Sequence, residues 1–263
     1  MKILVKILIV LLFTSVGMSC KKTPRMIVMA HRGASADSPE NTRIAVQTAV
    51  ESGADYAEID VHQTKDGEII LLHDETLDRT TSEKGYVWDF TWDEIRRLDA
   101  GSWFGDEFQG EPVPSLEEII RFSTGRIKLN IEIKISREEP DIVSKVVTII
   151  HNYDFEDDCI VTSFDREAVE KIKEIDHRIK TGFIFGKDYP EGVFTGSWEV
   201  LSCNYKVVDK EFVKKAKKNK KKVYVWTVDE KSEMLRLIDL KIDAIITNKP
   251  KYLVKVLREL NMR

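Results

Sequence analysis

The feature that most constrains the fold is a regular alternation of short apolar runs with amphipathic helical patterns along almost the whole chain. Several segments between the runs carry apolar residues at helical spacing, as at Ile142, Val146 and Ile149. A strand followed by a helix, repeated about eight times, is what a closed parallel barrel wrapped by helices requires. We therefore predict an α/β protein with a TIM (β/α)8 barrel, and a doubly wound open sheet is the competing architecture.

The predicted strands are residues 25–31, 56–64, 68–74, 126–134, 159–164, 180–186, 198–205, 222–229 and 243–248. The predicted helices are residues 41–53, 115–125, 141–153, 166–175, 210–220, 231–240 and 250–260.

One stretch, residues 75–114, interrupts this alternation. It has no clean period but contains Trp88, Trp92 and Trp103. A long irregular segment inside a compact domain is usually either functional or disordered, and its aromatic content argues against disorder. We predict a small ordered insertion after the second strand region, lying over the mouth of the barrel.

The N-terminal segment differs from the rest of the chain. Residues 1–19 have two lysines, an apolar run too short to cross a bilayer, and small or polar residues before Cys20, which predicts a secretory signal. Ser19 and Cys20 resemble the acylation site of bacterial lipoproteins, although Gly17 stands where the usual pattern has Leu. The expected organisation is a lipoprotein-type signal peptide at 1–19 with Cys20 acylated, a tether at 20–25, and a barrel domain at 26–263. A plain cleaved signal is the alternative.

That N-terminal segment predicts an exported, membrane-anchored protein of the cell envelope, facing the periplasm or the surface. The chain of 263 residues is 42% hydrophobic and 33% charged, as soluble globular proteins are. Its formal net charge of −4 disfavours a nucleic-acid partner. The membrane, reached through a lipid anchor, is therefore the expected macromolecular partner.

Two predicted strands carry acids on one face only. Glu58, Asp60 and His62 alternate with aliphatic residues, and so do Asn130, Glu132 and Lys134. Three carboxylates in an enclosed space repel one another unless a cation holds them. Oxygen-only ligation suits Ca²⁺ or Mg²⁺, so Glu58, Asp60 and Glu132 are candidate ligands of one divalent cation. The alternative is that these acids pair with Lys or Arg in a polar barrel interior.

Two histidines stand where predicted strands end. His31 follows the first apolar run and His73 ends the run 68–74. Imidazole titrates near neutrality, so the pair is suited to general acid and base catalysis. Arg32 and Lys134 could neutralise a phosphate between them, the Arg through a bidentate contact.

These residues belong to a set of motifs that resembles the glycerophosphodiester phosphodiesterase family. The motifs are "HRG" and "PENT", "EIDVHQTKDGEIILLHDETLDRTT", "NIEIK", "VYVWTVD" and "AIITNKP", in this order between Met26 and Lys251. The resemblance implies a TIM barrel with an insertion after the second strand region. It also implies a role for each candidate residue: His31 and His73 as general acid and base, Glu58, Asp60 and Glu132 as metal ligands, Arg32 and Lys134 as phosphate-binding residues, and Trp226 at the mouth against the glycerol end of the substrate. Asn248 departs from the family pattern, which commonly has Asp there.

The implied activity is metal-dependent hydrolysis of a glycerophosphodiester to sn-glycerol 3-phosphate and an alcohol. The sequence does not assign which histidine is the acid, nor whether water or the glycerol 2-hydroxyl attacks. A lysophospholipase D-like phosphodiesterase acting on lipids would use the same residues. A non-catalytic binding lipoprotein is the alternative from another class.

The remaining polar features have simpler interpretations. Glu40 and Asn41 are candidate ligand contacts, although Asn41 would serve equally as a helix N-cap. His62 is expected to support the site, and Cys159 and Cys203 to be unpaired buried thiols. His151 and His177 are expected at the surface. The lysine-rich run 214–222 predicts a solvated helix end, with contact to an anionic membrane as the alternative.

Overall fold

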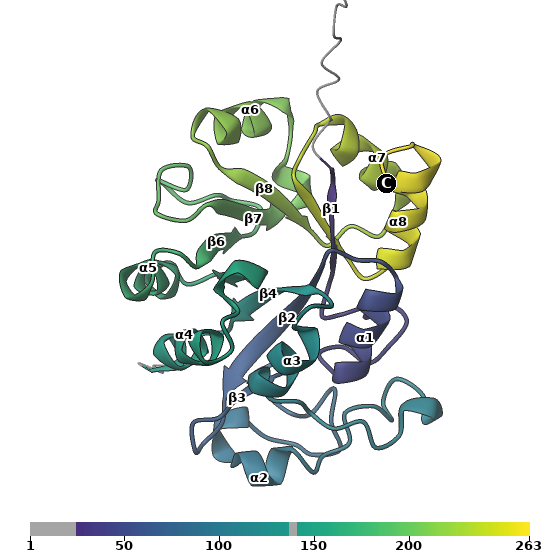
Figure 1. The fold of residues 1–263 in the computed structure, drawn as a ribbon, viewed down its shortest axis with the longest axis vertical. Helices are drawn as coiled ribbons and strands as arrows, with labels where there is room; N and C mark the ends of the chain where they lie inside the picture. Colours follow the sequence, from purple (N-terminus) through teal and green to yellow (C-terminus); the bar gives the residue numbers. More distant parts are fainter. Residues whose placement is uncertain (1–24, 137–140) are drawn as a thin grey trace, which may run out of the picture.

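The computed structural model describes residues 25–136 and 141–263 (Figure 1). The predicted signal peptide at 1–19, Cys20 and the tether up to residue 24 lie outside the described residues. Within the described part of the chain, none of the helices combines the length and apolar character needed to cross a membrane.

Eight parallel strands form a closed barrel, which confirms the predicted fold and excludes the open sheet. The barrel closes because β1 pairs in parallel both with β9 and with β2. The strands are β1 (Ile27–Ala30), β2 (Tyr56–Gln63), β4 (Lys128–Ile133), β5 (Cys159–Ser163), β6 (Lys180–Phe185), β7 (Val200–Asn204), β8 (Lys222–Trp226) and β9 (Ala244–Thr247).

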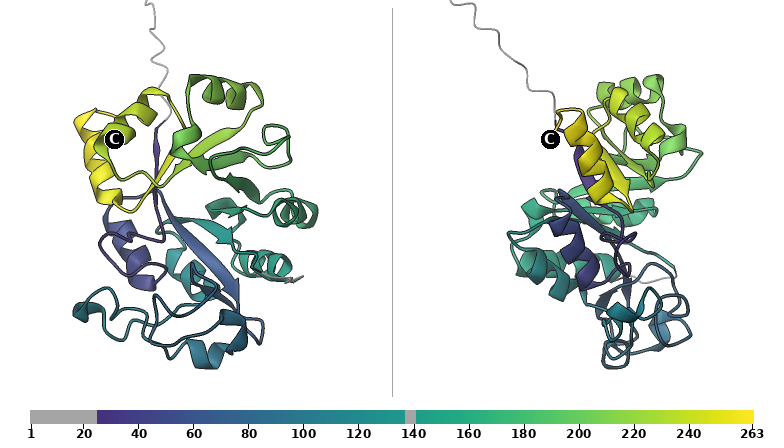
Figure 2. Two further views of the ribbon diagram at one scale, coloured as in Figure 1. Left: turned by 180° about the vertical axis from the view of Figure 1, so that it is seen from behind. Right: turned by 90° about the vertical axis from the view of Figure 1, so that its right-hand side faces the viewer.

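Helices cover the outside of the barrel (Figures 1 and 2). They are α1 (Arg43–Glu51), α3 (Leu116–Ser123), α4 (Ile142–Asn152), α5 (Arg166–Ile175), α6 (Lys210–Lys218), α7 (Lys231–Asp239) and α8 (Pro250–Glu259). The connection from β6 to β7, residues 186–199, contains no helix. Trp198 is fully buried there and donates its indole N–H to the Val193 carbonyl at 2.9 Å. An aromatic side chain thus covers the barrel where a helix is missing.

The predicted strand at 68–74 lies outside the barrel. Its strand β3 (Ile69–Leu71) pairs antiparallel with the end of β2. The insertion that follows, with the short helix α2 (Trp92–Ile95), has a buried apolar cluster of its own, which includes Leu77, Val87 and Ile95 and is continuous with Ile70 and Leu72. This cluster attaches the insertion to β3 at the side of the molecule, at the bottom of Figure 1, rather than over the barrel mouth as expected.

The barrel interior has an apolar and a polar layer. Met29, Ile160, Val200, Tyr224, Ala244 and Ile246 form one buried cluster inside. The next inward positions toward the carboxyl ends include Glu58 and Asp60 on β2 and Asn130 and Glu132 on β4. Aliphatic residues of the same strands, such as Ile59 and Ile131, face the helices and are fully buried. The alternation in sequence thus places acids inside the barrel, at the end where TIM-barrel enzymes have their active sites.

Candidate active site

All eight predicted site residues line one cavity of about 160 Å³ at the carboxyl ends of the strands. They are His31, Arg32, Glu58, Asp60, His73, Glu132, Lys134 and Trp226. Among the described residues that line this cavity, none comes from the insertion 75–114. The closed barrel therefore brings together side chains that lie far apart in the sequence.

The three acids form a candidate metal centre. Asp60 and Glu132 are register partners on adjacent strands, and Glu58 lies two residues before Asp60 on the same face. One carboxylate oxygen of each lies within 4.8 Å of one from the others. Burial, reinforced by the charge of Asp60, raises the pKa of Glu132 to about 7, and the pKa of Glu58 is raised well above its ordinary value for the same reasons. Oxygen donors with this excess of negative charge fit a divalent cation.

Two cationic side chains lie against this cluster. Lys134 Nζ is 2.9 Å from Asp60 Oδ1 and also contacts Glu132, and Arg32 Nε is 3.6 Å from Asp60 Oδ2. Burial would raise the pKa of Asp60, but Lys134 and Arg32 outweigh it and lower that pKa to about 2. Both predicted phosphate-binding residues thus border the candidate metal centre.

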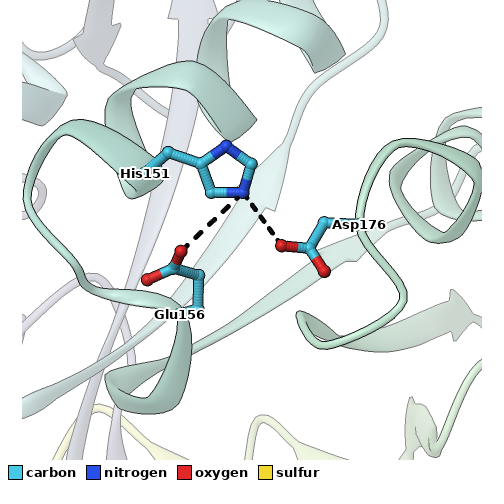
Figure 3. A group of neighbouring side chains, drawn as sticks. All are labelled: His151, Glu156 and Asp176. Atoms are coloured by element: carbon cyan, nitrogen blue, oxygen red, sulfur yellow. Dashed lines mark hydrogen bonds and ion pairs between the residues drawn. The ribbon is translucent and has the colours of Figure 1, made fainter.

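A second group of possible metal-binding side chains, His151, Glu156 and Asp176, lies outside the barrel (Figure 3). His151 Nε2 is 3.0 Å from Asp176 and 3.8 Å from Glu156. The guanidinium of Arg178 binds the same two carboxylates, at 2.7 Å and 3.4 Å. Because Arg178 already compensates these charges, the group is an ion-pair network that joins the end of α4 to the loop after α5.

The backbone after β1 is shaped by Arg32 and Gly33. Both have positive φ angles, 53° and 78°. A Cβ on Gly33 would lie 2.6 Å from Ala45, so only glycine allows this close approach to α1. In this turn the Arg32 backbone N–H donates to Glu58 Oε2 at 2.8 Å, and the Arg32 guanidinium donates to Glu40 at 2.8 Å. The "HRG" motif therefore forms a turn of the backbone that positions both His31 and Arg32.

The protonation of His31 is set by its neighbours. Asn248 Nδ2 donates to Asp229 at 2.6 Å, so the Asn248 Oδ1 atom faces His31 Nδ1, 2.6 Å away. Nδ1 must then be the donor, which leaves Nε2 of the neutral ring as an acceptor. Burial, assisted by the adjacent Arg32 charge, lowers the pKa of His31. Asn248, noted above as a departure from the family pattern, is therefore the residue that orients this histidine.

His73 has a different environment. Its Nδ1 lies 2.7 Å from Asp74 Oδ1, and Arg79 Nε donates to the same carboxylate at 2.7 Å. Arg79 also binds Glu40, which in turn binds Arg32, so a continuous chain of charged groups connects the loops that carry the two histidines. Arg79 is a contribution of the insertion to the rim of the site.

The supporting residues take defined positions. Asn41 is not an N-cap, because Thr42 caps α1; its side chain instead donates to Asp60 Oδ2 at 2.8 Å and accepts from the Asp60 backbone N–H at 3.0 Å. His62 is buried with Nε2 3.3 Å from the His73 carbonyl oxygen. Cys159 and Cys203 are free and buried. His151 and His177 are exposed, although His151 belongs to the network of Figure 3.

Three residues near the site were not identified from the sequence: Asp229, Arg79 and Phe164. Phe164 is 53% exposed and meets Trp226 edge to face, with ring centroids 5.9 Å apart. Both rings line the cavity. Phe164 and Asp229 end predicted strands as His31 does, so their positions were a usable signal. Arg79 stands in the quoted motif that ends in "DETLDRTT", but its partners Asp74 and Glu40 are decided by tertiary contacts of the insertion.

The fold and the site together define an α/β-barrel enzyme with acids and histidines converging at the carboxyl ends of its strands. A model of the glycerophosphoryl diester phosphodiesterase family matches residues 31–252. The chain is 39% identical over 240 residues to a glycerophosphodiester phosphodiesterase of Caldanaerobacter subterraneus subsp. tengcongensis, covering 89% of this chain and 99% of that protein. A Bacillus altitudinis protein of the same name is 32% identical, with 89% and 98% covered.

Solved structures agree with these relatives. An Oleispira antarctica phosphodiesterase in complex with the product sn-glycerol-3-phosphate superposes with a TM-score of 0.84 at 28% identity, covering 89% of this chain and 97% of that one. This chain belongs to the glycerophosphoryl diester phosphodiesterase family, whose members are phosphoric diester hydrolases. The predicted family and enzyme class are confirmed.

Proposed function

We propose that this protein hydrolyses glycerophosphodiesters to sn-glycerol 3-phosphate and an alcohol, with one divalent cation, Ca²⁺ or Mg²⁺, at Glu58, Asp60 and Glu132. The observation that carries the proposal is the convergence of two histidines, two cationic side chains and three carboxylates in one small cavity. The product in the Oleispira antarctica complex belongs to the same chemistry and supports it.

Two unsatisfied donors support a phosphate in this cavity. Arg32 Nε and Trp226 Nε1 are buried and have no hydrogen-bond partner among the described residues, and both side chains line the cavity. Buried donors normally have partners. A phosphodiester supplies anionic acceptor oxygens, and we infer that the bound substrate provides the missing partners.

Each group of site residues has a separate role in the proposed reaction. The cation, when bound, supplies Lewis-acid polarisation of a phosphate oxygen. Arg32 and Lys134 offset the charge that develops on the phosphoryl oxygens. One histidine accepts the proton of the attacking oxygen, and the other donates a proton to the departing alcohol as the phosphorus–oxygen bond to that alcohol breaks. Trp226 and Phe164 border the substrate at the rim.

The test is release of glycerol 3-phosphate from glycerophosphocholine by residues 25–263, with Ca²⁺, with Mg²⁺ and with chelator. We expect metal-dependent release, and a loss on the order of 10²–10⁴ in rate for His31→Ala and for His73→Ala. Full activity in a variant lacking both histidines would contradict the assignment. Release of choline from lysophosphatidylcholine, but no product from glycerophosphocholine, would instead favour a lipid phosphodiesterase.

We also propose that the protein is exported and anchored to a membrane of the cell envelope by a lipid on Cys20. The sequence of residues 1–20 supports this. Metabolic labelling with an alkyne fatty acid should label the full chain and not Cys20→Ser. Equal labelling of both, or an unlabelled protein in the cytoplasm, would contradict the proposal.

A further inference from the structure

A basic hollow of about 540 Å³ lies at the amino ends of β1 and β8, the end of the barrel opposite the active site. The ends of α6 and α7 border it, and in Figure 1 the start of β1 lies between these helices. We call this surface the basic face and define it by the six cationic residues that line the hollow: Arg25, Lys217, Lys220, Lys221, Lys222 and Lys241.

Most of this positive charge is not compensated. Lys217, Lys220 and Lys241 are exposed and make neither a hydrogen bond nor an ion pair through their side chains with any described residue. Lys221 donates only to neutral backbone carbonyls, those of Gly196 and Trp198.

Only two of the six are neutralised. Arg25 binds Asp55 at 2.9 Å, and Lys222 binds Asp243 at 2.8 Å. Four charges therefore remain on one face of a chain whose formal net charge is −4. Such a local concentration of positive charge attracts anionic surfaces even when the protein as a whole is acidic.

The uncharged residues that line the hollow favour a phospholipid surface over a nucleic acid as the anionic partner. Ile27, Ile238 and Met262 are half-buried side chains among the cations. A surface that combines apolar side chains with lysines suits the boundary between headgroups and acyl chains. A single-stranded nucleic acid would need exposed aromatic rings for base stacking, and Tyr224, the one aromatic residue lining the hollow within the described chain, is only 5% exposed.

The course of the chain points to the same partner. Arg25 lies on the basic face and follows Cys20 by five residues, which span at most about 18 Å when fully extended. A lipid on Cys20 would hold this face close to the bilayer, with Lys21 and Lys22 between them. We propose that the basic face docks on an anionic phospholipid surface, independently of the anchor.

Docking in this orientation decides what reaches the active site. Lys222 begins β8 on the basic face and Trp226 ends it at the cavity, so the two surfaces are at opposite ends of one strand. A docked molecule opens its cavity away from the membrane. This consequence rests on the proposed function, and it favours soluble glycerophosphodiesters over lipids of the membrane that holds the protein.

The test is sedimentation of residues 25–263 with phosphatidylcholine vesicles that contain or lack phosphatidylglycerol. This fragment contains the whole barrel, and the Caldanaerobacter subterraneus relative is matched over 99% of its own length, so a chain of this extent makes up nearly all of that protein. We expect binding to the anionic vesicles only, decreasing with salt, and an about 100-fold lower partition coefficient for the triple variant Lys217→Gln, Lys220→Gln, Lys241→Gln. The charge-matched control Lys65→Gln, Lys84→Gln, Lys255→Gln should change it less than about threefold.

The outcomes separate docking from the proposed function. No binding to anionic vesicles, equal loss in both triple variants, or tighter binding to RNA than to vesicles at the same salt concentration would each overturn the docking proposal. Hydrolysis of glycerophosphocholine is measured on the same samples, and both triple variants should retain it. An inactive protein that still binds would refute the proposed function and leave docking intact.

Discussion

His31 has different partners on the two sides of its ring. Nδ1 faces an amide oxygen that Asp229 holds in place, and Nε2 is left for the cavity. A neutral amide at this position stabilises the imidazolium less than a carboxylate would, and the pKa of His31 is lowered, first by burial and then by Arg32.

We therefore expect Asn248→Asp to raise the pKa of His31, because a carboxylate at Nδ1 stabilises the imidazolium. The limb of the pH–rate profile that His31 controls should move to higher pH, measured as kcat/KM with glycerophosphocholine. Ser35→Ala is the matched control, since it removes the other hydrogen bond to Asn248 Oδ1 without adding a charge. An unchanged profile in Asn248→Asp would show that Asn248 does not tune His31.

Among single residues, the sequence predicted the side chains proposed to react or to bind substrate better than it predicted the residues that hold them in place. The acids, histidines and cationic residues follow from residue type and strand alternation, because inward positions recur every second residue. The role of Asn41 did not follow: "NT" before a helix suits a cap at either residue, and only the tertiary contact with Asp60 decides between them.

The turn between β1 and α1 shows how an element positions a site. Gly33 combines a positive φ with close contact to α1, whereas Gly53 has a positive φ of 74° and open space around it.

Gly33→Ala should therefore lower the free energy of unfolding by more than Gly53→Ala, which is expected to cost about 1 kcal/mol from backbone strain alone. Gly33→Ala should also reduce kcat, because it shifts the loop that carries His31 and Arg32. Urea unfolding and steady-state kinetics of both variants check this. Equal stability losses would mean that the contact with Ala45 is unimportant.

Helices and strands were predicted best where a single hydrophobic period, helical or alternating, dominates the segment. They were predicted worst at β3 and the insertion, where the chain leaves the barrel. The barrel strands and their helices were located from hydrophobic pattern. The strand at 68–74 has the same apolar pattern as a barrel strand, and nothing local distinguishes β3, which pairs antiparallel with β2. The insertion was expected over the mouth, because its burial against Ile70 and Leu72 is not visible in its own sequence.

For the whole molecule, the carboxylates of the site make stability depend on pH when no cation is bound. The pKa of Glu132 in the folded protein is about 7, above its ordinary 4.5, and that of Glu58 is raised too. The unfolded chain therefore loses these protons at lower pH than the folded protein does, so the free energy of unfolding falls as pH rises through this window.

In chelator, the urea midpoint of residues 25–263 should be higher at about pH 5 than at about pH 8. Glu132→Gln should reduce this difference and also abolish activity, because it removes a buried charge and a predicted ligand. Saturating Ca²⁺ or Mg²⁺ should raise the midpoint at about pH 8 most, since binding to the folded state alone stabilises it. A midpoint that is independent of pH in chelator would contradict the raised pKa values.

The volume of the cavity has a consequence for selectivity. About 160 Å³ is below the 300–1,000 Å³ of drug-sized binding sites, and the lining of the cavity includes every residue proposed to hold the cation and the phosphate. A space of this size would enclose the glycerol phosphate half of the proposed substrate and leave the departing alcohol outside it. Under the proposed function, phosphodiesters that carry different alcohols would all give sn-glycerol 3-phosphate, and we expect this shared product, rather than any of the alcohols, to inhibit competitively.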